Sequence, residues 1–173
     1  MKKILIALAA LMLFAGYSQA QIGTDVANFV FTNSAACVGA LRGLSGDKYI
    51  VEFTYVKDIT TNAGVLLTYD RAFTPHNPNA NQTDMLNGGL TLKTSVYLLR
   101  RWNPQSNFKL DFGAYELAGT ATSGPNNGKP VNVAGGYVSY ENGNFDAELL
   151  LQNRIENDFY SGNYVGGQLG WRF

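Results

Sequence analysis

The chain has very few of the side chains that catalysis and metal binding usually need. It contains one cysteine, Cys37, and one histidine, His76. A lone cysteine excludes an internal disulfide, and we expect Cys37 to be a small buried or lipid-facing residue. A hydrolase or acyltransferase would place its histidine near a serine and an acidic group, but His76 lies in an Asn/Pro-rich segment without a nearby serine or a second strong metal ligand. We therefore predict that the chain is not an enzyme, and we assign no catalytic, cofactor-binding or metal-binding residue.

Charge is also scarce and carries no excess of one sign. Charged residues make up 15% of the chain, with 13 basic and 13 acidic residues. A surface without a basic field is not suited to the phosphate backbone, so direct nucleic-acid binding is not expected. Glycine and aromatic residues are abundant instead, with 19 glycines and 13% aromatics. This combination is typical of β-barrels, in which glycine permits close strands and aromatic rings lie at the membrane interfaces.

Only one long apolar run is present, and it lies at the start of the chain. Ile4 to Ala15 follows Lys2 and Lys3 and precedes the small-x-small sequence Ser18-Gln-Ala20. These are the three parts of a secretory signal, so we predict a signal peptide at 1–20 and a single domain at 21–173. The run is shorter than the ~20 residues of a membrane-spanning helix. A mature chain of this kind would cross a membrane as a closed barrel, the other way to satisfy every backbone group in lipid.

The last ten residues alternate with a period of two. One face is mostly apolar and the other is polar or small, which predicts a strand. The apolar face consists of Val165, Gly167, Leu169, Trp171 and Phe173. A closing strand that ends in phenylalanine resembles those of Gram-negative outer-membrane barrels. The resemblance implies that the barrel-assembly machinery recognises this segment. We therefore assign Leu169, Trp171 and Phe173 as a membrane-assembly signature.

The same alternation recurs along the chain between turn residues. It predicts strands at 48–58, 61–70, 90–100, 107–117, 131–140, 145–154 and 162–173. An eighth strand is expected within 29–41, and Gly135-Gly136 leaves the faces of the 131–140 strand unassigned. Each strand is about ten residues long, the length that a tilted strand needs to cross a bilayer.

The connections between these strands alternate in length. Short ones are expected at 59–60, at 101–106 and at the Asn-Gly turn in 141–144, whereas long polar loops are expected at 71–89 and 118–130. Short turns on one side and longer loops on the other are the pattern of a membrane barrel. We predict an all-β fold, an eight-stranded antiparallel up-and-down transmembrane β-barrel, in the outer membrane of a Gram-negative bacterium.

The inward positions of these strands carry charges of both signs. The predicted interior polar network consists of Glu52, Lys93, Lys109, Asp111, Asp146, Glu148, Arg154 and Arg172. An eight-stranded barrel has an interior just wide enough for side chains. Ions removed from water need partners, so we interpret these residues as a network of ion pairs and hydrogen bonds and not as a solute channel.

Several segments of the second half resemble a narrower family. They include 88–97, 107–120 with its Gly113-Ala-Tyr-Glu-Leu-Ala-Gly119, Val133-Ala-Gly-Gly136 and Leu149-Leu-Leu-Gln-Asn-Arg154. In this order they resemble the conjugative-transposon protein TraO family of Bacteroidota over residues 48 to 173. The chain departs from the family at Thr120-Ala-Thr122, where an aromatic run is expected, and in its N-terminal third. The resemblance implies a part in DNA transfer at the outer membrane and no catalytic residues.

Three functional hypotheses follow. The first is an outer-membrane barrel with a structural or interaction role in the envelope and in conjugative DNA transfer; its partners are outer-membrane lipid, the barrel-assembly machinery and other envelope or conjugation proteins. The second is a lipid-modifying barrel enzyme. The third is a soluble periplasmic lipocalin-like barrel, against which the inward charges argue because such a pocket is apolar.

Overall fold

The computed structural model describes residues 33–76, 82–97, 108–156 and 160–173. They form eight strands and one short 3-10 helix, η1: β1 (Ser34–Gly43), β2 (Tyr49–Asp58), β3 (Ala63–Phe73), β4 (Thr83–Tyr97), β5 (Lys109–Ala121), η1 (Gly124–Asn126), β6 (Pro130–Asn142), β7 (Phe145–Glu156) and β8 (Gly162–Arg172). The predicted signal peptide, 1–20, lies outside the described residues. Within the described part of the chain, no helix is long and apolar enough to cross a membrane.

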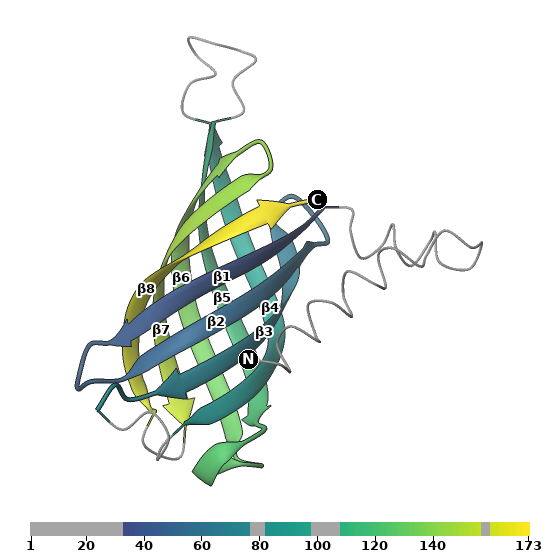
Figure 1. The fold of residues 1–173 in the computed structure, drawn as a ribbon. Coiled ribbons are helices and arrows are strands. Elements are labelled where there is room, and N and C mark those ends of the chain that lie inside the picture. The colour runs from purple at the N-terminus through teal and green to yellow at the C-terminus, as the bar shows by residue number, and fades with distance from the viewer. Residues whose placement is uncertain (1–32, 77–81, 98–107, 157–159) are drawn as a thin grey trace, which may run out of the picture.

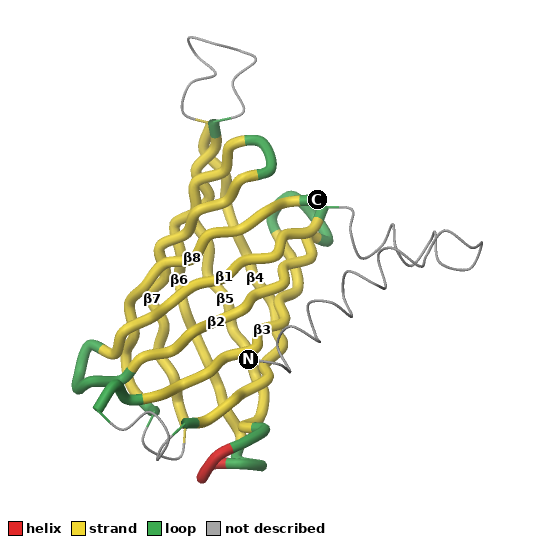
Figure 2. The backbone as a smooth tube through the Cα atoms, viewed as in Figure 1, coloured by secondary structure: helices red, strands yellow, loops and turns green. Residues whose placement is uncertain are grey.

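The eight strands close into one barrel in which each strand pairs with its neighbours in sequence. All pairs are antiparallel, and β1 closes the ring by pairing with β8. Figure 1 shows the strongly tilted strands of this ring, and Figure 2 shows that η1 is the single helical turn among the described residues. The predicted all-β, eight-stranded antiparallel up-and-down barrel is therefore confirmed. Every strand has two partners, so the sheet has no free edge.

The alternation of side chains explains which face of each strand lies inside. Along β2, Ile50, Glu52 and Thr54 are buried, whereas the residues between them lie on the outer face. Many of the inward residues pack as one apolar layer toward the end of the barrel that carries the 44–48 and 122–129 connections. This layer includes Leu41, Ile50, Ala72, Met85, Ala121, Val131, Tyr160 and Tyr164. We call the interior of the barrel the lumen. Fully buried members of the layer, such as Ile50, Met85 and Tyr164, close the lumen at this end.

The predicted loop at 71–89 is wrong over most of its length. β3 continues to Phe73 and β4 begins at Thr83, seven residues before the expected start. Polar residues misled the sequence argument here. Asn87 is buried inside the lumen, and Asp84 forms an ion pair on the outer face with Arg71, its partner across the ladder. Both therefore stabilise strand structure, although their composition resembles that of a loop.

Other boundaries differ less. β1 spans Ser34–Gly43, so it ends two residues after the expected window of 29–41. The connection expected at 118–130 is shorter, at 122–129, and contains η1. β6 keeps a regular alternation through Gly135-Gly136, with Val133 and Ser139 buried inside and Val138 exposed outside. The two glycines therefore cause no shift of register.

Candidate functional site in the barrel lumen

One arginine holds together a buried polar group in the part of the lumen next to the apolar layer. Arg154 Nη2 on β7 lies 2.9 Å from Asp70 Oδ2 on β3 and 3.1 Å from Glu52 Oε2 on β2. Gln152 donates a hydrogen bond to Glu52 at 2.9 Å, and Asn87 donates one to Asp70 at 2.8 Å. We call these five residues the Arg154 cluster.

The Arg154 cluster connects opposite walls of the barrel. β7 and β3 are separated by β8, β1 and β2 on one side and by β6, β5 and β4 on the other, so the side chain of Arg154 crosses the lumen. Arg154 is 1% exposed and Asp70 is 0% exposed. Buried ions are tolerated only with close partners, and here the guanidinium is shared between two carboxylates and the side chain of Gln152.

A second charged group fills the lumen nearer the opposite end. We call it the Arg172 cluster, and its members are Asp58, Lys93, Lys109, Asp111, Glu141, Asp146 and Arg172. Arg172 lies 2.9 Å from Asp58 and also contacts Glu141. Lys93 lies 2.9 Å from Asp58, and Lys109 lies 3.0 Å from Asp111 and 2.6 Å from Glu141.

The space between the two clusters is small. A cavity of about 20 Å³ lies there, and its wall includes Glu52, Lys93, Glu148 and Arg172. That volume has room for about one water molecule. Ligand pockets measure about 300–1,000 Å³, so this cavity is far too small to hold a ligand of that size.

The outer face of the barrel has the reverse polarity. Large apolar side chains on alternate positions are exposed around the ring, including Val38, Leu67, Leu90, Leu92, Phe112, Val138, Leu149, Leu151, Val165 and Leu169. Soluble monomers rarely expose apolar patches larger than a few hundred Å². The band ends at polar residues on the outer face, such as the Arg71–Asp84 ion pair and the exposed Asn153.

The eight residues predicted for the interior network all lie on the inward face. Arg154 joins Glu52, whereas Lys93, Lys109, Asp111, Asp146 and Arg172 lie in the second cluster. Glu148 takes part in neither, and accepts a hydrogen bond from Gln168. Sequence reasoning left out Asp58 and Glu141, which lie at strand ends where turn and strand are hard to tell apart.

The three residues of the predicted assembly signature lie on the outer face. Leu169 is 57% exposed, Trp171 is 55% exposed and Phe173 is 53% exposed. Trp171 is the register partner of Phe145 on β7, and Ala36 is its partner on β1. The signature therefore borders the seam at which the barrel closes.

His76 has no catalytic surroundings in the described structure. Its imidazole Nδ1 lies 3.6 Å from Asp47, and both side chains are largely exposed. No described serine is hydrogen-bonded to it. This pair does not form the Ser-His-acid arrangement of a hydrolase.

Cys37 is buried inside the lumen, next to acidic residues that the sequence had not linked to it. Its thiol, one Asp146 carboxylate oxygen and one Glu148 carboxylate oxygen lie within 4.8 Å of one another. Sequence alone does not reveal this group because the register of β1 against β8 and of β8 against β7 brings it together.

Comparisons with known proteins add no relative. No protein-family model matches the chain, and no curated protein or solved structure shows significant similarity to it.

Proposed function

We propose that the chain is a small outer-membrane barrel with a filled interior, which has a structural or interaction role in the cell envelope. The observation that supports this most directly is the inverted polarity, with a charged lumen inside an apolar outer band. A water-soluble barrel places its apolar residues inside, whereas a barrel in lipid needs them outside. Strands of 10–15 residues provide the length that a bilayer requires, about 9–11 residues.

Aromatic residues near the strand ends support the same placement. The rings of Phe108 and Tyr140 lie tilted against each other near the β6–β7 hairpin, with centroids 4.7 Å apart. Tyr49 and Phe73 stack with centroids 6.1 Å apart near the opposite end of the barrel, where β2 begins and β3 ends. Rings of this kind gather at the two membrane–water interfaces.

The filled lumen favours this role over the two alternatives. A lipocalin-like binder needs an apolar internal pocket, and a cavity of about 20 Å³ between two charged clusters does not provide one. A lipid-modifying enzyme needs a nucleophile with its base at one rim, and among the described residues the His76–Asp47 pair has no nucleophile hydrogen-bonded to it. We therefore expect the chain to act through contacts at the ends of the barrel or on its outer face.

Cell fractionation and gel mobility test the proposal. The chain should sediment with the outer membrane, resist extraction by carbonate and migrate faster on a gel when it is not heated. In planar bilayers it should give no stepwise conductance. A chain that stays soluble in the periplasm without detergent would contradict the membrane placement, and stable conductance steps would contradict the filled lumen.

The resemblance to the TraO family extends the proposal to conjugative DNA transfer. The matching segment Gly113–Gly119 lies in the middle of β5, so the resemblance concerns the barrel wall. We expect that deleting the gene from a donor strain lowers mating frequency and that the intact chain restores it. Unchanged mating would remove the conjugation role and leave the envelope role standing.

A further inference from the structure

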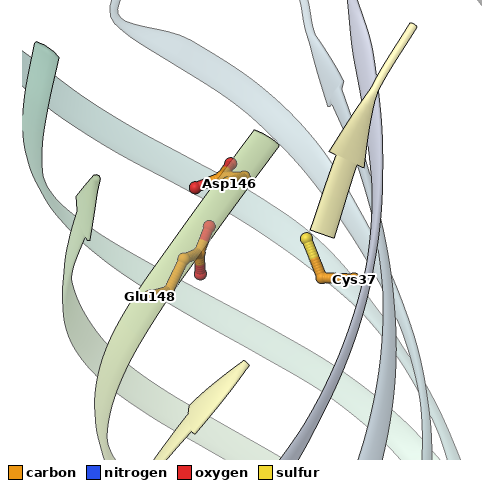
Figure 3. A group of neighbouring side chains, drawn as sticks. All are labelled: Cys37, Asp146 and Glu148. Carbon is orange, nitrogen blue, oxygen red and sulfur yellow. The ribbon is translucent and has the colours of Figure 1, made fainter. Parts of the chain in front are cut away.

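Three side chains that can bind a metal ion converge on the lumen wall near the Arg172 cluster. They are Cys37 on β1 and Asp146 and Glu148 on β7, with one ligand atom of each within 4.8 Å of the other two. Figure 3 shows the sulfur of Cys37 on the side of its strand that faces the two carboxylates. β8 separates β1 from β7 in the barrel, so the group spans three neighbouring strands.

A glycine on the middle strand makes this approach possible. Gly170 on β8 is the register partner of Cys37 on one side and of Asp146 on the other. A Cβ atom at Gly170 would lie 2.3 Å from Cys37 Sγ, a distance at which the thiol would have to move. With hydrogen in that place, the sulfur reaches across β8 toward Asp146.

Asp146 supplies an independent observation that points to a cation. It is 0% exposed, and neither of its carboxylate oxygens accepts a hydrogen bond from any described residue. Its charged contact is Arg172, whose Nε lies 3.3 Å from Oδ2. Oδ1 is left buried without a hydrogen-bond donor, which is costly for a carboxylate unless a cation or proton compensates it.

The charge balance of the lumen points the same way. The two clusters and Glu148 together contain seven carboxylates and four cationic side chains: Glu52, Asp58, Asp70, Asp111, Glu141, Asp146 and Glu148 against Lys93, Lys109, Arg154 and Arg172. Glu148 receives its hydrogen bond from the neutral amide of Gln168 and has no cationic partner among the ion pairs of the described residues. The lumen groups therefore carry more negative than positive charge, and part of this negative excess lies beside the Cys37 thiol.

We propose that Cys37, Asp146 and Glu148 form a binding site for a thiophilic divalent cation, with Zn²⁺ as the best fit. Zn²⁺ takes one sulfur and two oxygen ligands readily, in tetrahedral geometry. Ligand atoms around tetrahedral Zn²⁺ are about 3.5 Å apart, so small side-chain rotations bring this group to bonding distance. Asp146 binds through Oδ1 and keeps Oδ2 toward Arg172.

Cation binding changes the protonation of one group. The Cys37 thiol gives its proton to the buffer, and the resulting thiolate forms the sulfur–metal bond. The site gains two positive charges from the cation and one negative charge from the thiolate, so the negative excess of the lumen falls by one. The small cavity beside Glu148 has room for a water that supplies the fourth ligand.

The full chain, purified in detergent micelles, provides the test. Titration with Zn²⁺ should show one ion per barrel, and Co²⁺ should produce the ultraviolet charge-transfer band of a thiolate–cobalt bond. We expect Cys37→Ser to abolish that band and to weaken Zn²⁺ binding about tenfold or more, because even residues that only support metal ligands cost about 10–100-fold. Gly170→Ala should have a similar effect by displacing the sulfur.

Matched substitutions on the outer face serve as controls. Gly136→Ala introduces a Cβ whose nearest neighbour, the backbone oxygen of Gly113, is 3.5 Å away, and Glu116→Gln removes an exposed carboxylate. Neither substitution should alter Zn²⁺ binding. Asp146→Asn and Glu148→Gln should each weaken it. Unheated gel mobility verifies that every variant is folded.

The wild-type barrel gives a second measurement that needs no variant. Zn²⁺ should raise the urea concentration at the midpoint of unfolding, because a ligand that binds the folded state stabilises it, whereas Mg²⁺, which prefers oxygen ligands, should not. Zn²⁺ affinity that is equal in the wild type and in folded Cys37→Ser, or an unfolding midpoint that Zn²⁺ leaves unchanged, would overturn the site.

Discussion

Tyr137 lies over Gly113, the residue directly opposite it across the β5–β6 ladder, and a Cβ atom at Gly113 would be 2.2 Å from the ring. Tyr115 covers Gly135, its own partner, in the same way. The two rings fill the lumen side by side, with their centroids 6.3 Å apart. Glycine opposite tyrosine therefore makes room for each ring against the wall, an arrangement known to stabilise sheets.

Gly113→Ala should destabilise the barrel by about 1–3 kcal/mol, the usual cost of adding a methyl group to a packed interior. The ring of Tyr137 would have to leave its position, where its hydroxyl lies 3.2 Å from that of Thr91. Urea titration in micelles measures the free energy of unfolding. Gly136→Ala, on the outer face, should change it by less than about 0.5 kcal/mol; equal effects of the two substitutions would contradict the packing argument.

Arg154→Met should destabilise the barrel by about 3–5 kcal/mol, because Glu52 and Asp70 would remain buried without their shared cation. The same titration measures this loss. Replacing both carboxylates as well, with Glu52→Gln and Asp70→Asn, should restore part of it. Arg42→Met removes an exposed arginine that lies 5.9 Å from the centroid of the Tyr49 ring, so it should cost less than about 1 kcal/mol. A small loss in Arg154→Met would mean that the cluster contributes little.

Leu149→Lys separates a membrane barrel from a soluble one. Leu149 is 71% exposed near the middle of β7, so in a bilayer the lysine should cost about 2–4 kcal/mol, whereas Asn153→Lys near the strand end should cost about 0–1. Unfolding of both variants in lipid vesicles measures the difference. In water an exposed leucine tolerates lysine within about 0.5 kcal/mol, so equal stabilities would argue against lipid contact.

Phe173→Ser tests the assembly signature. We expect less folded barrel in the outer membrane of cells, and unchanged refolding of the purified chain in micelles, because the substitution acts on recognition by the assembly machinery. Phe145→Ser provides the control, since it removes another exposed outer-face phenylalanine, 40% exposed, on the strand next to β8. Equal loss of assembly in both variants would assign the effect to lipid contact alone.

The sequence predicted the faces of the strands well because alternation is local. Glu52, Asp146 and Arg154 were placed inward from their neighbours alone, and the structure shows them in the lumen. The sequence could not predict which residues pair across the lumen. The contact between Arg154 and Asp70, for example, depends on the stagger of all the strands between them. The start of β4 was missed because Asn87 is polar yet buried, and the Cys37 group was missed because it depends on two registers at once.

The position of Arg154 has a mechanical consequence. A hollow barrel of strands can flatten or shear, because its hydrogen-bonded ladders resist bending less than they resist stretching. A side chain that bonds opposite walls across the lumen fixes the diameter of the barrel. Any widening of this barrel has to separate the Arg154 guanidinium from Asp70 first. We therefore expect the eight strands of the wall to behave as a rigid frame.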